Sequence, residues 1–410
     1  MSNAQKKNVP ELRFSGFEGE WEEKKLGEVT TQSMYGIGAS ATSFDSKNIY
    51  VRITDIDEKS RKLNYQNLTT PDVINNKYKL KRNDILFART GASTGKSYIH
   101  KGEKDIYNYY FAGFLIKFEI NEQNSPLFIY QFTLTSKFNN WVKVMSVRSG
   151  QPGINSEEYA KLPLVLPNKL EQQKIGQFFS KLDRQIELEE QKLELLQQQK
   201  KGYMQKIFSQ ELRFKDENGE EYPEWEEKQL GEVAEIIGGG TPSTKNKLYW
   251  NGEINWFSPI EIGNKTYVYS SQKKITEEGL RKSSAKILPV GTILFTSRAG
   301  IGKTAILAKE STTNQGFQSI VPRKGVLDSY YVYTISNILK ILAEKVSAGS
   351  TFSEISKKQM EQLNLNIPMI KEQKNISKFF SKFDNLIEIQ ERKLKLLKQQ
   401  KQGLLQKMFI

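Results

Sequence analysis

Apolar residues recur at alternating spacings of four and three in the middle of the chain and again at its end. In the first stretch they are Ile175, Phe179, Leu182, Ile186, Leu193, Leu196, Tyr203 and Ile207, and in the second Ile376, Phe380, Phe383, Ile387, Leu394, Leu397, Leu404 and Met408. This spacing is typical of a coiled-coil seam. Each stretch therefore predicts one long helix whose narrow apolar face needs a partner.

The two helical stretches are copies of each other. Residues 171–208 and 372–409 are identical at about 22 of 38 positions. Upstream, residues 11–14 (ELRF), 21–24 (WEEK) and 26–29 (LGEV) recur as residues 211–214, 225–228 and 230–233. The repeating unit is therefore a globule followed by a helix.

Between these anchors the copies share only islands. The first copy has Ile-Leu-Phe at 85–87 followed by Arg89, Gly91, Gly95 and Lys96, and the second has Ile-Leu-Phe at 293–295 followed by Arg298, Gly300, Gly302 and Lys303. Short β-branched and aromatic runs at 48–53, 85–88, 111–118, 254–257, 292–296 and 317–321 predict strands, and residues 125–144 and 329–346 predict helices. Function is expected to reside in the parts that diverged.

These patterns predict an α+β fold. We expect two mixed α/β globules separated by two long antiparallel coiled-coil helices, with internal pseudo-two-fold symmetry from the tandem repeat. The expected organisation is an N-terminal segment at 1–20, a first globule at 21–162, a first spacer helix at 163–209, a linker at 210–224, a second globule at 225–366 and a second spacer helix at 367–410. Asn168 followed by Glu171 has the spacing of a capping box at the start of the first helix.

Connectivity predicts the direction of helix pairing. The first helix leaves the first globule for the second, so the two helices pack along their lengths only if they are antiparallel. Setting the polar breaks of the two stripes against each other predicts a register with four pairs: Glu189 opposite Lys401, Lys200 opposite Gln390, Leu193 opposite Leu397, and Leu196 opposite Leu394. Helices in separate bundles, or coiled coils between molecules, are the alternatives.

Composition narrows the class of protein. Lys and Arg number 61 against 47 Asp and Glu, a formal charge of +14, which favours polyanions such as nucleic acid. Charge alone is equally compatible with a protein that is merely soluble and basic. With no cysteine and one histidine, disulfides are excluded and a Cys/His zinc site nearly so. No run has the length of a membrane span, and we expect a cytoplasmic protein without a membrane partner.

The duplicated order of these motifs resembles the specificity subunit of a type I restriction-modification system. The resemblance rests on the ELRF segment before Trp21, the LGEV segment, the Leu-Phe-x-x-Arg-x-Gly turn at 294–300 with its counterpart at 86–91, the Leu-Pro-rich exit at 162–167 and the Glu-Gln that opens each long helix. It covers essentially the whole chain. Each motif alone is weak, whereas their order repeated twice is specific.

The resemblance implies two target-recognition domains, each of which reads one half of an asymmetric bipartite sequence in double-stranded DNA. It implies that the helical spacer docks two modification (methyltransferase) subunits and that restriction (motor-nuclease) subunits join the complex. S-adenosylmethionine, ATP and magnesium are then expected on those partner subunits, with no cofactor or metal on this chain. The chain itself is expected to be non-catalytic.

Enzymatic interpretations of the same sequence are weaker. Residues 91–97 resemble a phosphate-binding loop, but only three residues separate Gly91 from Gly95-Lys96 where four are required. No Asn-Pro-Pro-Tyr or Asp-Pro-Pro-Tyr segment is present to hold the amino group of a methylation target. The triplet Asp57-Glu58-Lys59 lacks the upstream partner of a nuclease site and is expected to be a solvated turn. His100 is expected to be a surface residue.

The candidates for DNA contact are basic residues that lie near glycine turns and near aromatic residues. In the first globule they are Arg52, Lys79, Lys81, Arg82, Arg89 and Lys96, and in the second Lys245, Lys247, Lys273, Lys274, Arg281, Lys282, Arg298, Lys303 and Gln315. Arginine and glutamine favour base reading, so Arg89, Arg298 and Gln315 are the preferred readers. The solvated-surface interpretation competes at each position.

Glutamines along the helices, among them Gln172, Gln177, Gln191, Gln198, Gln373 and Gln399, predict a polar outer face suited to protein partners. Two classes of function remain open on the sequence. One is a non-catalytic DNA-reading scaffold, and the other is a structural adaptor with two interaction domains on a coiled-coil spacer and no role with DNA.

Overall fold

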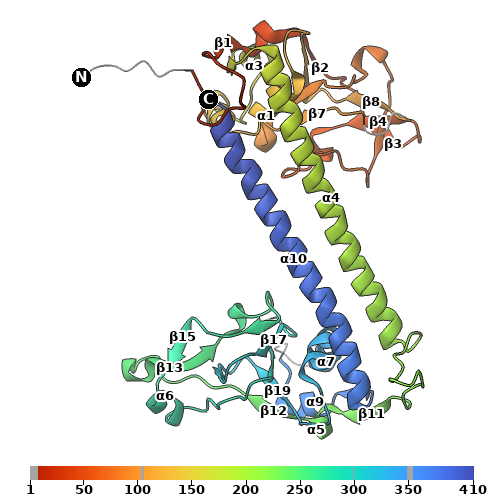
Figure 1. Ribbon diagram of the computed structural model, residues 1–410, viewed down its shortest axis with the longest axis vertical. Coiled ribbons are helices and arrows are strands. Elements are labelled where there is room, and N and C mark those ends of the chain that lie inside the picture. Colours follow the sequence, from red (N-terminus) through yellow and green to blue (C-terminus); the bar gives the residue numbers. More distant parts are fainter. Residues whose placement is uncertain (1–7, 103–105, 299, 349–353) are drawn as a thin grey trace. The chain divides into compact units, whose positions relative to one another are not determined.

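The computed structural model describes residues 8–102, 106–298, 300–348 and 354–410. The chain divides into two compact units, one formed by residues 1–192 with 390–410 and the other by residues 193–389. Two long helices, α4 (Lys169–Phe208) and α10 (Ile370–Met408), each contribute one part to each unit (Figure 1). The first seven residues of the predicted N-terminal segment lie outside the described residues.

The first unit is built on a four-stranded sheet in the order β2-β9-β6-β7. Three two-stranded sheets, β1-β10, β3-β5 and β4-β8, accompany it. Its elements are β1 (Glu22–Lys25), η1 (Leu26–Val29), β2 (Thr30–Tyr35), β3 (Ala41–Ser43), β4 (Asn48–Val51), η2 (Ile53–Asp55), β5 (Thr69–Pro71), η3 (Asn76–Tyr78), β6 (Ile85–Ala88), η4 (Gly91–Ser93), β7 (Ser97–Ile99), β8 (Asn108–Phe111), β9 (Leu115–Ile120), α1 (Pro126–Phe132), α2 (Ser136–Met145), α3 (Ser156–Ala160) and β10 (Pro163–Leu166).

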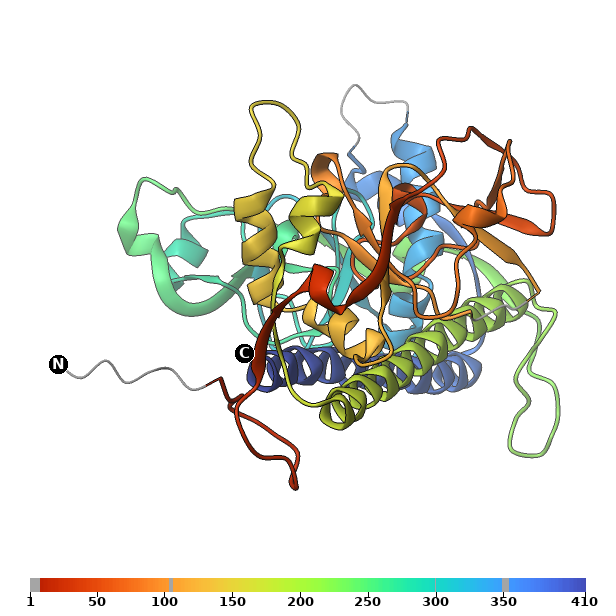
Figure 2. The ribbon, with the colours of Figure 1, turned by 90° about the horizontal axis from the view of Figure 1, so that it is seen from above.

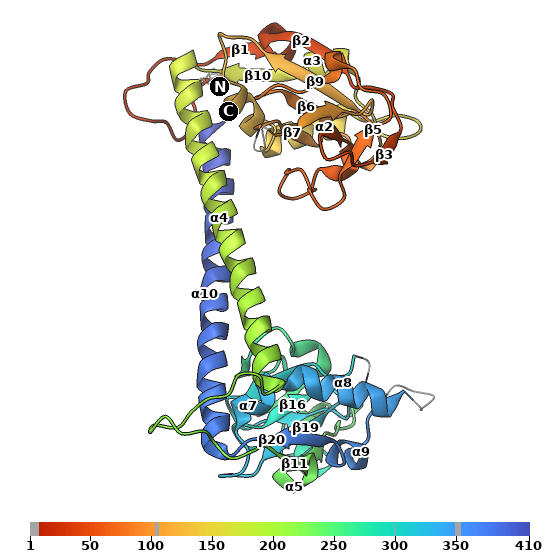
Figure 3. The same ribbon diagram turned by 90° about the vertical axis from the view of Figure 1, so that its right-hand side faces the viewer.

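The second unit repeats this plan with a five-stranded sheet in the order β12-β19-β16-β17-β14, and adds a three-stranded sheet in the order β15-β13-β18. Figure 3 shows β16 and β19 of the larger sheet with α7 and α8 nearby. Its elements are β11 (Glu226–Gln229), α5 (Leu230–Val233), β12 (Ala234–Gly238), η5 (Lys247–Tyr249), β13 (Trp250–Phe257), η6 (Pro259–Glu261), β14 (Tyr267–Val268), β15 (Lys273–Ile275), α6 (Glu277–Arg281), β16 (Ile293–Phe295), β17 (Thr304–Leu307), β18 (Thr312–Thr313), β19 (Gln318–Pro322), α7 (Ser329–Thr334), α8 (Ser336–Ser347), α9 (Lys357–Glu361) and β20 (Asn364–Ile367).

Each globule is closed by a strand pair that joins its first and last strands. β1 pairs antiparallel with β10, and β11 pairs antiparallel with β20. Pro163–Leu166 therefore belongs to a sheet, and α4 begins at Lys169 and not at the predicted boundary of 163. Between α4 and β11 the chain forms a loop that extends beyond the end of α4 (Figure 2).

The start of each long helix is fixed by a buried ion pair. Asn168 caps α4 as predicted, because its Oδ1 accepts the backbone N–H of Glu171 at 3.0 Å. The fully buried Glu171 carboxylate is bound instead by Arg13, at 2.7 Å from both Nε and Nη2. Glu372 and Arg213 repeat this arrangement in the second unit. The arginine of each ELRF segment thus recurs because it binds the buried glutamate at the start of a long helix.

The predicted outer-face position is wrong for two of the helix glutamines. Gln172 and Gln373 are buried, at 2% and 1% exposure. Gln172 accepts the N–H of Ser125, the residue that caps α1, and donates to the carbonyl of Pro167. Gln373 accepts the N–H of Asp328, the cap of α7, and donates to Pro368. These side chains fasten each long helix to its globule because a helix start leaves backbone groups to be satisfied.

The two long helices are antiparallel within each unit, as predicted. In the first unit Lys401 pairs with Asp183 at 2.6 Å, and Glu189 contacts Gln390 and Lys393. In the second unit Lys200 pairs with Asp384, which is also the acceptor for the hydroxyl of Tyr330. Lys200 with Asp384 and Lys401 with Asp183 are the same contact in the two copies of the repeat.

The predicted register is wrong. Lys401 faces Asp183, six positions before Glu189, and Lys200 faces Asp384 and not Gln390. The predicted pairs Leu193 with Leu397 and Leu196 with Leu394 rested on the same register and have no other support. The prediction set the polar breaks of the two stripes against each other, whereas partly buried lysines take the register that supplies a carboxylate.

The charge pair at this register gives a testable expectation. Asp183→Ala and Lys401→Ala are each expected to destabilise the first unit, and the double-mutant cycle should give a coupling of about 1 kcal/mol because both groups are only partly buried. Chemical denaturation of the three variants measures it. A coupling energy near zero would contradict the register, and Lys398→Ala, which removes an exposed partner of Glu190, serves as the control.

Candidate nucleic-acid interface

A glycine turn connects β6 to β7 in the first unit. The N–H of Ala88 donates to the carbonyl of Lys96 at 2.8 Å, and the N–H of Gly95 donates back to Ala88 at 3.1 Å. Gly95 has φ +86°, and a Cβ there would lie 2.5 Å from Val142 of α2. Glycine is therefore required by both conformation and space. The turn places Arg89 at the end of a fully buried strand.

The second unit has the same turn between β16 and β17 with one residue fewer. The N–H of Thr296 donates to the carbonyl of Lys303, so Lys303 corresponds to Lys96. However, the carbonyl of Ser297 accepts the N–H of Ile355, just as that of Arg89 accepts the N–H of Ile154. Arg89 therefore corresponds to Ser297, and the sequence-based match of Arg89 with Arg298 is wrong by one position. The shorter turn causes the shift.

Arg89 lies against two exposed aromatic rings. The carbon of its guanidinium is 5.1 Å from the ring centroid of Tyr35, at the end of β2, and 5.9 Å from that of Phe114, before β9. These are cation–π distances. The Nε atom of Arg89 is buried and has no hydrogen-bond partner in the described part of the chain. Tyr35 and Phe114 are here named the aromatic pair. The sequence did not single them out, because exposed and buried aromatic residues cannot be told apart from sequence alone.

Two candidates of the first globule are engaged inside the protein. The amine of Lys96 is buried, donates to the carbonyl of Ile56 at 3.1 Å and pairs with Glu58 at 2.8 Å. Arg52 forms a two-pronged ion pair with Asp55, and this hydrogen bonding raises the pKa of Arg52. The expectation that the turn presents Lys96 to a ligand is therefore not supported. The phosphate-loop interpretation loses its lysine for the same reason.

The remaining basic candidates of the first globule are exposed. Lys79, Lys81 and Arg82 lie on the segment that leads into β6. Lys81 is 3.5 Å from Glu119, but its side chain is 72% exposed, so this pair leaves its charge available to a ligand. Lys79, Lys81 and Arg82 thus lie before β6 and Arg89 after it, at opposite ends of the strand.

In the second globule most candidates gather around the three-stranded sheet. Lys273 and Lys274 lie on β15, Lys247 on η5 and Arg281 on α6, while Lys245 and Lys282 adjoin these elements. Lys273 lies over the ring of Trp250, with Nζ 5.8 Å from its centroid. Lys274 is 3.6 Å from Glu253, whose side chain is 96% exposed. This basic group is therefore assembled from three short segments, 245–247, 273–274 and 281–282, that the fold brings to one sheet.

Of the other candidates in the second globule, Gln315 lies near a glycine loop at 238–240. Gln315 is exposed and accepts a hydrogen bond from Thr241. The indole N–H of Trp256 donates to Gly240 at 2.8 Å, and Cβ atoms on Gly239 or Gly240 would collide with neighbouring backbone. Arg298 is half-buried and Lys303 is exposed. The lack of side chains at Gly239 and Gly240 thus lets the loop pack closely against residues 313–314 and 284–285.

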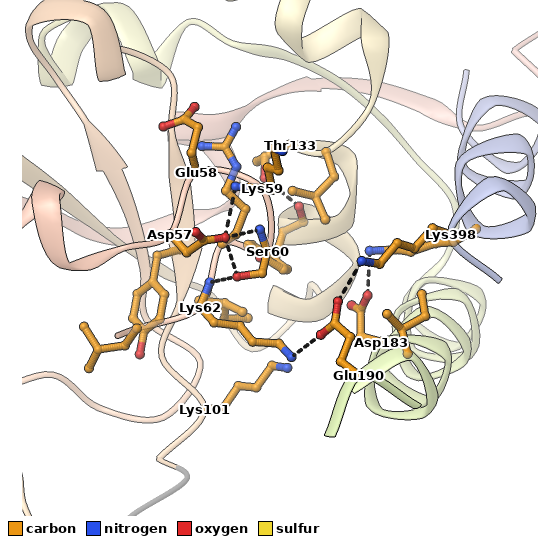
Figure 4. A pocket seen from close by; sticks show the side chains of 18 of the residues that line it. Asp57, Glu58, Lys59, Ser60, Lys62, Lys101, Thr133, Asp183, Glu190 and Lys398 are labelled. Atoms are coloured by element: carbon orange, nitrogen blue, oxygen red, sulfur yellow. Dashed lines mark hydrogen bonds and ion pairs between the residues drawn. The ribbon is translucent and has the colours of Figure 1, made fainter. Parts of the chain in front are cut away.

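A cavity of about 630 Å³ lies in the first unit between the globule and the helices (Figure 4). The segment around Asp57 to Lys62 forms one wall and side chains of α4 and α10 another. Glu190 contacts Lys62 and Lys398 across it, at 3.5 and 2.8 Å. Asp57 accepts the N–H groups of Lys59 and Ser60 in a turn, as its sequence predicted. The charges that line the cavity are mixed in sign, which gives no clear preference for an anion.

The prediction for His100 is wrong. The ring is 4% exposed, lies 3.2 Å from the hydroxyl of Tyr98 and packs against Tyr109. Within residues 8–102, 106–298, 300–348 and 354–410, no group of three or more His, Asp or Glu side chains is placed to hold a metal ion. Among the helices of this described part, none is both long and apolar enough to cross a membrane.

Known proteins share this architecture. Residues 18–198 and 222–399 match the family described as type I restriction modification DNA specificity domain. The MjaIX type I restriction enzyme specificity subunit of Methanocaldococcus jannaschii is 39% identical over 198 residues, 46% of this chain and 45% of that relative. The putative MjaX specificity subunit of the same organism is 25% identical over 401 residues, 94% of this chain and 92% of that relative.

The chain thus aligns with less than half the length of MjaIX but with nearly all of MjaX. A crystal structure of the type I restriction-modification S subunit from M. genitalium has the same fold, with a TM-score of 0.66 at 15% identity over 98% of this chain and 99% of that one. The family match covers both globules and most of both long helices. This chain therefore belongs to the type I restriction-modification DNA specificity family and carries its domain twice.

Proposed function

We propose that this protein is the DNA sequence-recognition subunit of a type I restriction-modification complex, and that each globule reads one half of an asymmetric bipartite target. The observation that carries the proposal is the repeat itself. The two globules share a sheet order, a glycine turn and a buried ion pair, yet differ in the side chains at that turn. A shared frame with unlike side chains suits a split target whose halves differ.

The charge of the chain supports the same proposal. The excess of basic residues favours DNA over an uncharged partner. Two modification subunits are proposed to dock on α4 and α10, and restriction subunits to join them. S-adenosylmethionine, ATP and magnesium would then act on those subunits, while this chain supplies no catalytic group. The alternative, an adaptor without DNA, is favoured by no observation beyond the long helices.

Binding to DNA duplexes at several salt concentrations tests the proposal. The chain with its modification subunits should bind its target with an affinity that falls steeply with salt, and Lys247→Ala should lower the slope of log K against log salt by about 1 by removing a phosphate contact. Lys228→Ala, on β11 and paired with Glu226, is the matched control and should leave the slope unchanged. Absence of DNA binding by the intact complex would favour the adaptor.

A further inference from the structure

We propose that Arg89 reads one guanine of the DNA target and that the aromatic pair, Tyr35 and Phe114, positions it. This inference rests on the proposed function and names the residue and the base through which the first globule obtains part of its specificity. Its starting point is a guanidinium that lies against two rings, at 5.1 and 5.9 Å from their centroids.

Arg89 is held in place, but its charge has no partner among the residues that the structure describes. Within the described residues no carboxylate forms an ion pair with it, whereas Arg52, Arg13, Arg148 and Arg213 all have one. Its Nε atom is sealed by the surrounding side chains without a hydrogen bond. A guanidinium fixed in this way presents its Nη edge, because its Nε side is closed off.

Rigid elements hold the two rings. The hydroxyl of Tyr35 accepts the backbone N–H of Ser156, at the start of α3, at 3.1 Å. The carbonyl of Phe114 accepts the N–H of Arg89 itself at 3.1 Å. Tyr35 ends β2 and Arg89 follows β6, so all three residues are anchored to the central sheet. Side chains based on such elements lose little freedom when they bind.

The surroundings favour a base edge over a phosphate. Tyr35 and Phe114 are 41% and 60% exposed, so apolar surface flanks the guanidinium. A phosphate keeps its hydration best among polar neighbours, whereas a base edge tolerates apolar contact. Guanine offers O6 and N7 as a pair of acceptors in the major groove, which matches the two donors of a fixed guanidinium.

The second globule lacks the whole arrangement. Backbone hydrogen bonds align Arg89 with Ser297 and Phe114 with Gly316, because Ser297 donates to Gly316 as Arg89 donates to Phe114. Strand pairing aligns Tyr35 with Gly238: Tyr35 lies opposite Ile116, two residues after Phe114, and Gly238 lies opposite Gln318, two residues after Gly316. All three side chains are replaced by small ones.

The second globule leaves little room for a ring at the position that corresponds to Phe114. A Cβ on Gly316 would lie 3.0 Å from Pro259, so a ring does not fit there without a shift. Because the frame is shared and the three side chains are lost together, they form one functional group. The guanine they read therefore belongs to the half of the target read by the first globule.

The test uses the complex of this chain with its modification subunits, after the target has been found from the methylated sites of cells that carry the system. Competition between duplexes that differ at single base pairs then measures discrimination. Arg89→Ala is expected to lower discrimination at one G·C pair of the first half-site by about 10- to 100-fold and to leave the other positions unchanged. Arg89→Lys keeps the positive charge but not the two paired N–H donors of the guanidinium, and it should lower discrimination at the same base pair.

The aromatic pair is tested at the same base pair. Tyr35→Ala and Phe114→Ala should each lower discrimination at this base pair by about 3- to 10-fold, since a loosened guanidinium still reaches the base. Tyr35→Phe keeps the ring but loses its hydrogen bond to Ser156, so it should retain more discrimination than Tyr35→Ala. Arg298→Ala should affect only the other half-site. Melting temperatures confirm folding of every variant.

Three results would overturn the inference. A uniform loss of affinity for all sequences in Arg89→Ala, with a salt slope lower by about 1, would make Arg89 a phosphate contact. Unchanged discrimination in Arg89→Ala and Arg89→Lys would remove Arg89 from the interface. If the wild-type complex shows no sequence preference, the proposed function itself fails, which the wild-type measurement reports separately.

Discussion

Arg213→Ala is expected to destabilise the second unit by about 3 to 5 kcal/mol. The fully buried carboxylate of Glu372 would lose the guanidinium at 2.8 Å and keep a single described side-chain donor, the indole N–H of Trp225 at 3.1 Å. An uncompensated buried charge is costly because the interior solvates it poorly. Hydrogen exchange at β11 and at the start of α10 measures the effect locally.

The matched control is Lys357→Ala, which removes an exposed ion pair with Glu361 in the same unit and should change stability by no more than about 0.5 kcal/mol. Equal exchange rates in Arg213→Ala and in the control would contradict the assignment of this ion pair as the anchor of the second helix. Arg13→Ala should reproduce the effect in the first unit, where Glu171 is equally buried.

Phe409→Ala is expected to destabilise the first unit by about 3 to 5 kcal/mol. The ring follows the last turn of α10, is 4% exposed and lies 4.8 Å from Phe128 and 5.9 Å from Phe179, measured between centroids. Its removal leaves a cavity among α1, α4 and α10. Chemical denaturation of the full chain, followed at the first unit by hydrogen exchange, gives the loss.

Leu396→Ala is the control for Phe409→Ala, since Leu396 lies on the same helix but is 59% exposed and should matter by less than about 0.5 kcal/mol. If the two variants were equally stable, the end of α10 would not be anchored in the core of the first unit.

The sequence predicted the repeated architecture well because long-period patterns are robust. The coiled-coil stripes gave both helices, and connectivity gave their antiparallel direction. The strand predicted at 111–118 is two strands, β8 and β9, because Ala112, Gly113 and Phe114 form a turn between them. The helix predicted at 125–144 is likewise two, α1 and α2, because Thr135 caps a new helix start. Local capping and turn chemistry overrode the average pattern.

The register and the candidate site were harder to predict for a common reason. Both depend on which charged side chains find partners, and a sequence does not show this. Lys401 pairs with Asp183 and not with Glu189. Lys96 pairs with Glu58, whereas Arg89 has no ion-pair partner among the described residues. The role of the aromatic pair became visible only when strand pairing brought Tyr35 and Phe114 to the same place.

The most direct test of the account is the sequence of the sites methylated in cells that carry this chain with its modification subunits. If each of the two unlike globules reads one half-site, the methylated sites share a bipartite motif with two unlike specified halves separated by unspecified bases. A single contiguous motif, two identical halves, or a methylation pattern that does not depend on this chain would contradict it.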